Sequence, residues 1–428
     1  MVMKVLVLGG GGREHALIWK IAKSTQVSQV YSVPGNAGIG QMAGVECYQV
    51  DVGKNFAGLI EFSKKKKIDL TVVGPEAPLV NGMVDAFEAA GLHILGPTQS
   101  AAKIEGSKVW AKELMERYAI PTAPFKVFDS VASAMTYLTE QNRFPIVVKA
   151  DGLTGGKGAI VCGNLMEATT AVVQMMVDKE WGDAGNRVVI EDYLDGEEAS
   201  FIVLTDGVNV VPLASSQDHK AIYEGGPNTG GMGAYSPAPV VTPEMHERIM
   251  REIIKPTITA MVDEGRLYRG VLYAGLMITA DGPKVLEYNC RCGDPETQPI
   301  MVRLESDIVP ALLACIDGTL DQVNLKWNDK AAVCVVMASG GYPGQYEKGK
   351  VITGLDAVGT MEDVVVFHSG TALDTQGQFV TAGGRVLGVT ALGEDIRRAQ
   401  LRAYQAVDLI KFEDEYHRTD IAWRAINR

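Results

Sequence analysis

The segment KVLVLGGGGREHALIWKIAKS, residues 4–24, constrains the fold more than any other part of this chain. An apolar run, a turn of four glycines and a helical pattern follow one another there, which is how a βαβ unit begins. Short apolar runs that end in Gly, Pro or Asn recur to about residue 100, with helical stretches between them. We therefore expect residues 1–104 to form an open parallel α/β domain.

The rest of the chain has a different pattern and divides into two further parts. A chain of 428 residues is too long for one ordinary core. Residues 105–325 begin with a lysine-bearing helix and continue as a more antiparallel, β-rich region, which predicts a domain of two lobes. After a polar break, residues 326–428 predict a small α+β domain. The expected fold class is a multidomain α/β and α+β protein.

Charge and hydropathy narrow the classes of partner. The formal net charge of -12 argues against nucleic acid, which is bound through Lys and Arg. No apolar run reaches the roughly 20 residues that cross a bilayer, and the N-terminus lacks a signal-peptide pattern. These features predict a cytoplasmic protein with no membrane partner. No predicted helix has a conspicuous exposed apolar face, so we expect a monomer.

The glycine turn, residues 9–12, does not match a dinucleotide fingerprint. The pattern G-x-G-x-x-G would need glycine where Glu14 or His15 stands, and the next strand ends without an acidic residue for a ribose hydroxyl. These departures argue against NAD. Several backbone N–H groups at a helix N-terminus still favour an anion such as phosphate. A tight turn with no ligand is the alternative.

A second glycine-rich loop lies in KADGLTGGKGAIV, residues 149–161, between two apolar strands. It is not a Walker A loop, because Asp151 stands where its first glycine should be and Gly158 replaces its Ser or Thr. Its residues 152–158 form a predicted hairpin with Lys157 near the tip. The hairpin either folds over a triphosphate with its N–H groups or is a flexible turn with a solvated lysine.

The strand KVLEYN, residues 284–289, brings a carboxylate and an amide to one face. Glu287 and Asn289 alternate along the strand and so point the same way, and their oxygens suit Mg²⁺ shared with phosphate. A surface strand face is the alternative. Arg291 and Asp294 follow directly, either as site residues or as an ion pair with each other.

A third glycine-rich stretch, SQDHKAIYEGGPNTGGMGAYSP, spans residues 216–237. It is too long and too rich in glycine to predict regular structure, and long ordered loops are often functional lids. We therefore predict a lid that carries Asp218 and Lys220.

These features together resemble a known superfamily. The order of Lys149, the hairpin, Glu191 with Leu194 and Glu198, and then Glu287-x-Asn289 resembles the ATP-grasp ligases. The stretches NTGGMGAYSPAP and RCGDPETQP, with GGGGREHAL, VPGNAG and GGYPG, resemble the glycinamide ribonucleotide synthetase family along practically the entire chain. Cys292 stands where that family usually has an aromatic residue.

The resemblance implies an ATP-dependent ligase of purine biosynthesis that joins glycine to 5-phosphoribosylamine through glycyl phosphate. Its implied cofactors are ATP and Mg²⁺, with Mn²⁺ as an alternative ion. The implied nucleotide contacts are Lys108, Lys149, Gly155, Gly156 and Lys157 at the phosphates, Glu191 and the Leu194 backbone at adenine, and Glu198 at the ribose. Glu287 and Asn289 would bind the metal, although the preceding strand, VLYAGLMIT, offers no further acid.

The resemblance also implies where the two other substrates bind. Phosphoribosylamine would contact Gly11, Gly12, Asn36 and Glu76. From side-chain chemistry, we expect Arg291 to bind the glycine carboxylate or the acyl phosphate, and Asp294, or Asp218 with Lys220, to hold the glycine ammonium or an amine proton. Two rivals stay open. One is a ligase of the same fold that uses bicarbonate or formate, and the other is a nucleotide-binding regulatory protein without turnover.

Overall fold

The computed structural model describes residues 2–428 and begins with a five-stranded parallel sheet. The strand order is β3-β2-β1-β4-β5, and every pair is parallel, which confirms the predicted open α/β sheet. The strands are β1 (Met3–Gly9), β2 (Val27–Pro34), β3 (Val45–Cys47), β4 (Leu70–Val73) and β5 (Ile94–Leu95). The helices around them are α1 (Gly12–Ile21), α2 (Ala37–Gly40), α3 (Ala57–Lys66), α4 (Glu76–Val80) and α5 (Met83–Ala89).

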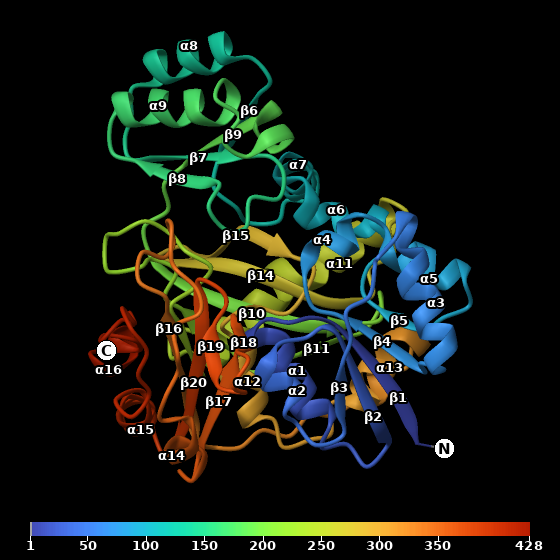
Figure 1. The fold of residues 1–428 in the computed structure, drawn as a ribbon. Helices are drawn as coiled ribbons and strands as arrows, with labels where there is room; N and C mark the ends of the chain where they lie inside the picture. The colour runs from blue at the N-terminus through green and yellow to red at the C-terminus, as the bar shows by residue number, and fades with distance from the viewer. Residues whose placement is uncertain (1) are drawn as a thin grey trace.

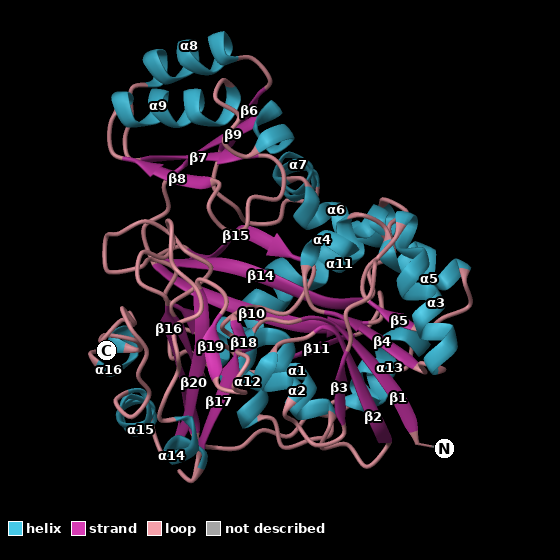
Figure 2. Ribbon diagram, in the orientation of Figure 1, coloured by secondary structure: helices cyan, strands magenta, loops and turns pink. Residues whose placement is uncertain are grey.

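Residues 125–192 form a separate lobe (Figure 1). Its antiparallel sheet has the order β6-β9-β7-β8, and helices α8 and α9 pack together on one side of it (Figure 2). The elements are β6 (Phe125–Phe128), α8 (Val131–Gln141), β7 (Ile146–Ala150), β8 (Ala159–Cys162), α9 (Leu165–Met176) and β9 (Val188–Asp192). The predicted hairpin, residues 152–158, connects β7 to β8 and lies on the side of the lobe that faces the rest of the molecule.

A second antiparallel sheet, of order β11-β10-β14-β15, lies below the lobe in the view of Figure 1. Its strands are β10 (Glu197–Thr205), β11 (Val210–Pro212), β14 (Gly270–Thr279) and β15 (Gly282–Asn289). The helices associated with it are α6 (Gln99–Gly106), α7 (Lys108–Arg117), α10 (Pro243–Ile249), α11 (Lys255–Asp263) and α13 (Val309–Asp317). The helix α12 (Thr297–Arg303) packs instead against α1 and the C-terminal sheet. The two antiparallel sheets are the two predicted lobes.

The C-terminal sheet corrects one expectation about the third glycine-rich stretch. Its order is β12-β13-β16-β20-β17, so both ends of that stretch form strands rather than an irregular lid. Gly233 allows this, because a Cβ there would lie 2.7 Å from the Cys334 carbonyl oxygen of the neighbouring strand. The strands are β12 (Gln217–Asp218), β13 (Gly233–Ser236), β16 (Ala331–Ala338), β17 (Val364–His368) and β20 (Arg385–Gly393).

A smaller hairpin and three helices complete the C-terminal part. They are β18 (Thr371–Leu373), β19 (Phe379–Thr381), α14 (Leu355–Gly359), α15 (Ile396–Val407) and α16 (Trp423–Ile426). The predicted boundaries at residues 104 and 325 place each sheet's main strands in one segment, and we propose them as domain limits. The strands β12 and β13 cross the second boundary to join the C-terminal sheet.

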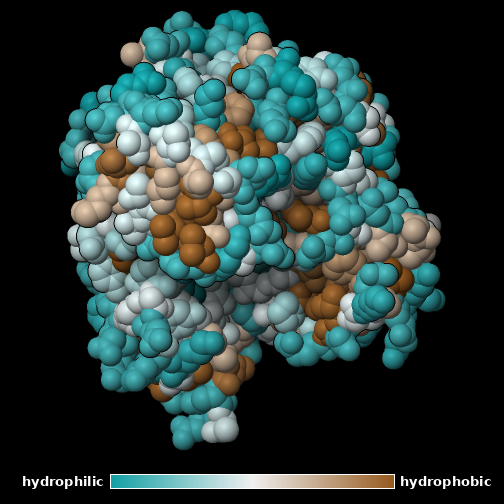
Figure 3. All heavy atoms as spheres, turned by 90° about the horizontal axis from the view of Figure 1, so that it is seen from above, coloured by the Kyte–Doolittle hydropathy of each residue, from teal (hydrophilic) through white to brown (hydrophobic). Residues whose placement is uncertain are grey.

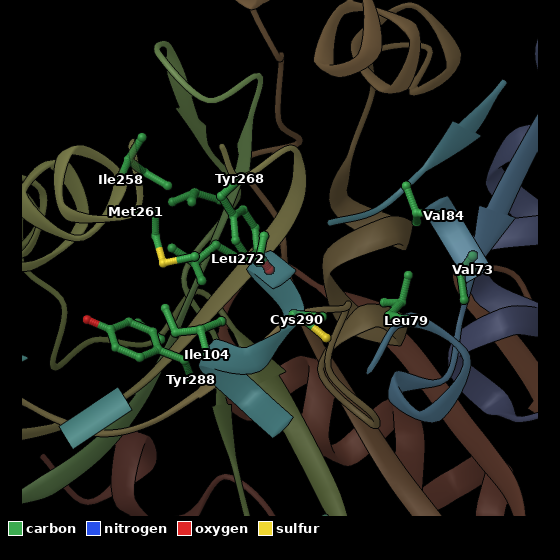
Figure 4. Packing of buried hydrophobic residues seen from close by; sticks show 14 of the residues in the cluster. Val73, Leu79, Val84, Ile104, Ile258, Met261, Tyr268, Leu272, Tyr288 and Cys290 are labelled. Atoms are coloured by element: carbon green, nitrogen blue, oxygen red, sulfur yellow. The ribbon is translucent and has the colours of Figure 1, made fainter. Parts of the chain in front are cut away.

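The hydrophobic cores do not follow the domains of the sequence. One core joins Leu79 of the first domain to Leu272 of the central sheet and to Met261 on α11 (Figure 4). The lobe instead has a core of its own, formed by residues of β7, β8, β9, α8 and α9. The first domain and the central sheet are therefore one packed body, to which the lobe is attached.

The face shown in Figure 3 is mainly hydrophilic, with apolar areas interrupted by polar ones. Within residues 2–428, no helix combines the length and the apolarity that spanning a membrane requires. The monomeric state stays a prediction.

Candidate functional site

A cavity of about 350 Å³ lies between the lobe and the central sheet. It collects residues from the hairpin, α7, β15, the segment around β12 and β20. The predicted residues in its wall are Glu76, Lys108, Lys149, Gly155, Gly156, Asp218, Lys220, Glu287, Asn289, Arg291 and Asp294. The predicted residues outside its wall are Gly11, Gly12, Asn36, Lys157, Glu191, Leu194 and Glu198. Sequence positions far apart thus converge on one space.

Glu287 and Asn289 share the cavity face of β15, as their alternation predicted. They pair with Gly275 and Tyr273 of β14, and a register shift follows at Leu276. Two oxygen donors on one face fit a hard cation that is also bound by phosphate. Among the described residues there is no group of three His, Cys, Asp or Glu side chains suited to a metal.

A lysine lies close to this oxygen pair. The Nζ of Lys220 is 3.8 Å from Glu287 Oε1 and 3.3 Å from Glu198 Oε2. Burial opposes ionisation of Glu287, but Lys220, Lys108 and Lys149 outweigh it and keep the pKa of this carboxyl below its usual value. Glu198, on β10, is thus an acid near the oxygen pair that the preceding strand could not supply. Glu287 is held in the charged form that a cation requires.

Asp218 has the opposite electrostatic setting. Burial raises the pKa of its carboxyl well above the usual value, and Lys220 offsets only part of the rise, while Glu296, Glu198 and Glu287 add to it. A carboxyl that resists ionisation is suited to donating a hydrogen bond or holding a proton in the cavity.

Two lysines and the glycine hairpin form the cationic end of the cavity. Lys149 Nζ donates to the Leu286 carbonyl at 3.0 Å, and Lys108 Nζ donates to the Gly152 carbonyl at 2.9 Å. Burial lowers the pKa of Lys108, which Glu287 partly opposes. Lys157 reaches away from the cavity, where its Nζ donates to the Pro343 carbonyl at 3.3 Å. The hairpin therefore already touches the C-terminal part.

Glu191 is buried behind the cavity wall rather than exposed in it. Its two carboxylate oxygens lie 2.5 Å from the Nζ atoms of Lys149 and Lys112. Burial opposes ionisation, but the two ammonium groups keep the pKa of Glu191 below its usual value. Leu194 is buried nearby against Ala123. The contacts of Glu191 and Leu194 with adenine stay predictions.

Arg291 is held by two carboxylates from the first domain and α6. Its Nε is 3.2 Å from Glu76 Oε2, and its Nη2 is 3.6 Å from Glu105 Oε1. Burial opposes its charge, but Glu105 and Glu76 more than compensate and raise the pKa of the guanidinium. Arg291 does not pair with Asp294, so the ion pair considered from the sequence is wrong. Its fork is fixed at the cavity wall.

Asp294 is held instead by the C-terminal part. Its Oδ2 lies 2.7 Å from Arg385 Nη2, and its Oδ1 accepts from Gln298 Nε2 at 2.8 Å. The Arg385 guanidinium also donates to the Gly230 carbonyl at 2.5 Å. Arg385 is thus a cavity residue that the sequence did not suggest, since it lies 91 residues from Asp294.

The glycine turn lies beside Asp294. A Cβ on Gly12 would lie 3.6 Å from Asp294 Oδ1 and 2.6 Å from Gln298 Nε2. Gly11 N donates to Glu14 Oε2 at 2.6 Å. The side chain of Asn36 donates to two backbone carbonyls at 2.8 Å and caps α2, so it holds the turn in place. Contacts of these residues with a substrate stay predictions.

A buried carboxylate at the cavity edge was also missed from the sequence. Glu296 Oε1 accepts from Tyr273 Oη at 2.6 Å and from Ser200 Oγ at 3.1 Å. The motif RCGDPET contains Glu296, but only its position against β10 and β14 shows that it is enclosed.

Comparison with known proteins places this arrangement in a class. Biotin carboxylase from Campylobacter jejuni, solved as a β,γ-ATP complex, is similar with a TM-score of 0.75 at 14% identity, covering 100% of this chain and 96% of that one. At this identity the likeness concerns the fold alone. The family model "Phosphoribosylglycinamide synthetase, ATP-grasp (A) domain" matches residues 106–297. The fold and the cavity thus define an ATP-grasp protein.

The full length of the chain identifies the family. The N-domain and C-domain models of phosphoribosylglycinamide synthetase match residues 3–105 and 332–424. The phosphoribosylamine–glycine ligases of Vibrio parahaemolyticus and Escherichia coli O157:H7 are 56% and 54% identical, over 100% of this chain and 99% of each relative. The solved ligase of Thermotoga maritima is 33% identical with a TM-score of 0.84, covering 98% of this chain and 100% of that one. The chain belongs to the phosphoribosylglycinamide synthetase family.

Proposed function

We propose that this protein is an ATP-dependent ligase that joins glycine to 5-phosphoribosylamine and releases glycinamide ribonucleotide, ADP and phosphate. The observation that carries the proposal is the cavity, in which a lysine-lined glycine hairpin, an oxygen pair and a fixed arginine meet. The names of the full-length relatives supply the substrates. The protein would act in purine biosynthesis.

The chemistry explains why one cavity holds all these groups. A carboxylate is a poor electrophile at neutral pH, so glycine must first take the γ-phosphoryl group of ATP as glycyl phosphate, with release of ADP. The amine of phosphoribosylamine then attacks the acyl carbon, phosphate leaves, and the nitrogen loses a proton. Lys108 and Lys149 would balance the charge of the phosphate chain, and the hairpin would cover it.

Glu287 and Asn289 would hold Mg²⁺, or Mn²⁺, against the phosphate oxygens. When bound, the ion neutralises negative charge on the transferred phosphoryl group. The charged state of Glu287 and the shared face of the two side chains support this assignment. Arg291 would bind the glycine carboxylate or its acyl phosphate with its planar fork, and Asp294 would accept from the glycine ammonium.

The test is release of ADP from Mg²⁺ and ATP with glycine, with and without phosphoribosylamine generated in situ. The proposal expects turnover only when glycine and the amine are both present. ADP release that ignores glycine but responds to bicarbonate or formate would overturn the substrate assignment and keep the fold. A protein that binds ATP but never turns it over would instead be a regulatory nucleotide-binding protein.

The role of Arg291 is tested by Arg291→Lys. A single ammonium cannot bridge Glu76 and Glu105 and also present a fork, so turnover should fall about 100-fold, as for loss of one preorganised donor. ATP affinity should change little. Arg143→Lys, at an exposed position of the lobe, is the matched control. Normal turnover of Arg291→Lys would refute the assignment.

A further inference from the structure

Lys112 is a buried lysine that neither the motifs nor the family resemblance pointed to. It lies on α7, and its side chain is 3% exposed. Its Nζ is 2.5 Å from Glu191 Oε2 and donates to Thr122 Oγ1 at 2.6 Å and to the Ala123 carbonyl at 3.5 Å. An ammonium has three N–H donors, and two of these donate to the groups at Thr122 and Ala123. Lys112 is therefore held in place by neighbours of its own as well as by Glu191.

Lys149 contacts the same carboxylate but differs in this respect. Its Nζ is 2.5 Å from Glu191 Oε1 and donates one hydrogen bond, to the Leu286 carbonyl at 3.0 Å. Both lysines line the cavity, but Lys149 lies on β7 where the hairpin begins, so a phosphate covered by the hairpin meets it directly. The buried carboxylate thus has two ammonium partners, of which one is available to a nucleotide.

A buried carboxylate needs at least one cationic partner, because a buried charge without any partner is very costly. If Glu191 had Lys149 alone, each phosphate contact of Lys149 would draw the only counter-charge away from Glu191. Lys112 comes from α7, outside the lobe, and is tied to Thr122, whose Oγ1 donates to the Val285 carbonyl at 2.7 Å. Its position is therefore set from outside the lobe and does not depend on where the Lys149 ammonium points.

We propose that Lys112 is a positioning residue for nucleotide binding: it keeps the buried Glu191 carboxylate neutralised while Lys149 turns to the phosphates of ATP. This inference rests on the proposed use of ATP, and not on which acid or amine is joined. In this role Lys112 acts through Glu191, although it also lines the cavity.

Because Lys112 can lose its proton, the proposal predicts that ATP affinity depends on pH. Burial lowers the pKa of Lys112 to about 8, with Glu191 of β9 opposing the shift and Lys149 of β7 adding to it. The Phe125 ring of β6 faces the same ammonium at 5.5 Å. Above pH 8 the free protein loses this charge, so Lys149 becomes the only counter-ion and ATP affinity should weaken.

The experiment measures calorimetric binding of a non-hydrolysable ATP analogue with Mg²⁺ to the full chain, without glycine or amine. Lys112→Met should fold, because Glu191 keeps Lys149 in the free protein. Its affinity should nevertheless fall about 30-fold or more, as when one partner of a buried charge pair is lost. Lys126→Met, on the exposed side of β6, is the matched control and should bind like the wild type.

A second pair of variants separates this role from a direct phosphate contact. In a Glu191→Gln background there is no charge to neutralise, so adding Lys112→Met should change affinity little. An equal loss in both backgrounds, or a wild-type affinity that is unchanged from pH 7 to pH 9, would overturn the proposal. Because no acid or amine is present, these outcomes are independent of the ligase assay, which tests the substrates alone.

Discussion

The glycine turn and the glycine hairpin have similar compositions but use glycine for opposite reasons. In the turn, a Cβ on Gly10 would lie 2.3 Å from the Gly35 carbonyl oxygen, so the space is filled by backbone. In the hairpin, a Cβ on Gly155 would meet no atom within 4 Å, and the residue needs glycine only for its φ of +60°. The turn is packed solid, whereas the hairpin is open at its tip and packed at its ends, where a Cβ on Gly152 or Gly158 would lie 2.8 or 2.4 Å from its nearest neighbour.

The difference shows what a glycine-rich motif can mean. The turn fixes the start of α1 against the C-terminal part, because Gly12 lies against Gln298 and Ser369. The hairpin tip contacts the C-terminal part through Lys157 and Pro343, and Gly155 beside it has open space around it. Substitutions in a fixed loop should mainly lower the free energy of unfolding, and substitutions in an open loop should mainly weaken ligand binding.

The largest expected effect is that of Gly10→Ala. The new methyl would overlap backbone atoms that cannot move like a side-chain end, so the free energy of unfolding should fall by about 3 kcal/mol. Urea unfolding followed by circular dichroism measures it. Gly359→Ala is the control, because no atom lies within 4 Å of its Cβ position and its φ is not positive. Equal stability of the two variants would show that the turn is not rigid.

The packed turn should also carry a pH dependence that the hairpin lacks. His15 and His368 lie together beside it, and the backbone N–H of His368 donates to His15 Nδ1 at 2.9 Å. Burial lowers the pKa of His15 to about 3, with a further decrease from His368, and burial lowers the pKa of His368 to about 4. The unfolded chain therefore takes up these protons first as the pH falls.

The resulting stability is complete above pH 6.5, the ordinary histidine value, and is lost as the pH falls towards 4. Between pH 6.5 and 5 each histidine should cost about 2 kcal/mol of unfolding free energy. The variant His368→Asn should lose less stability over this interval than the wild type. Identical pH profiles of the two proteins in urea unfolding would contradict the neutral buried state.

The smallest expected effect on folding is that of Gly155→Ala. A left-handed conformation costs a residue with a Cβ about 1 kcal/mol, and no clash adds to it. Nucleotide affinity should fall more noticeably, since the tip loses conformations needed for closure. Unfolding and analogue binding, measured on the same preparation, compare the two. A loss of stability as large as that of Gly10→Ala would remove the distinction between the loops.

The sequence predicted those features that depend on local order. Alternation placed Glu287 and Asn289 on one face, and apolar runs predicted the parallel sheet and the antiparallel lobes. It missed Lys112 and Arg385 because their meaning depends on partners that are distant in the chain, Glu191 and Asp294. A lysine in a helix and an arginine in a strand look like surface residues until a buried carboxylate is placed against them.

The same reason explains the expectation about the third glycine-rich stretch. Its ends are strands only because β16, about a hundred residues later in the sequence, offers a free edge to β13. The partners of Arg291 were likewise hidden, because Glu76 and Glu105 belong to the first domain and α6.

The separate core of the lobe has a consequence for cooperativity. Because the first domain and the central sheet share one core, a local opening in either should spread through both, whereas residues 125–192 can open alone. Hydrogen exchange of the amide protons of β7 and β9 would then give an opening free energy smaller than that of global unfolding. A bound nucleotide, which contacts both the lobe and the body, would make the opening of the lobe and global unfolding a single transition.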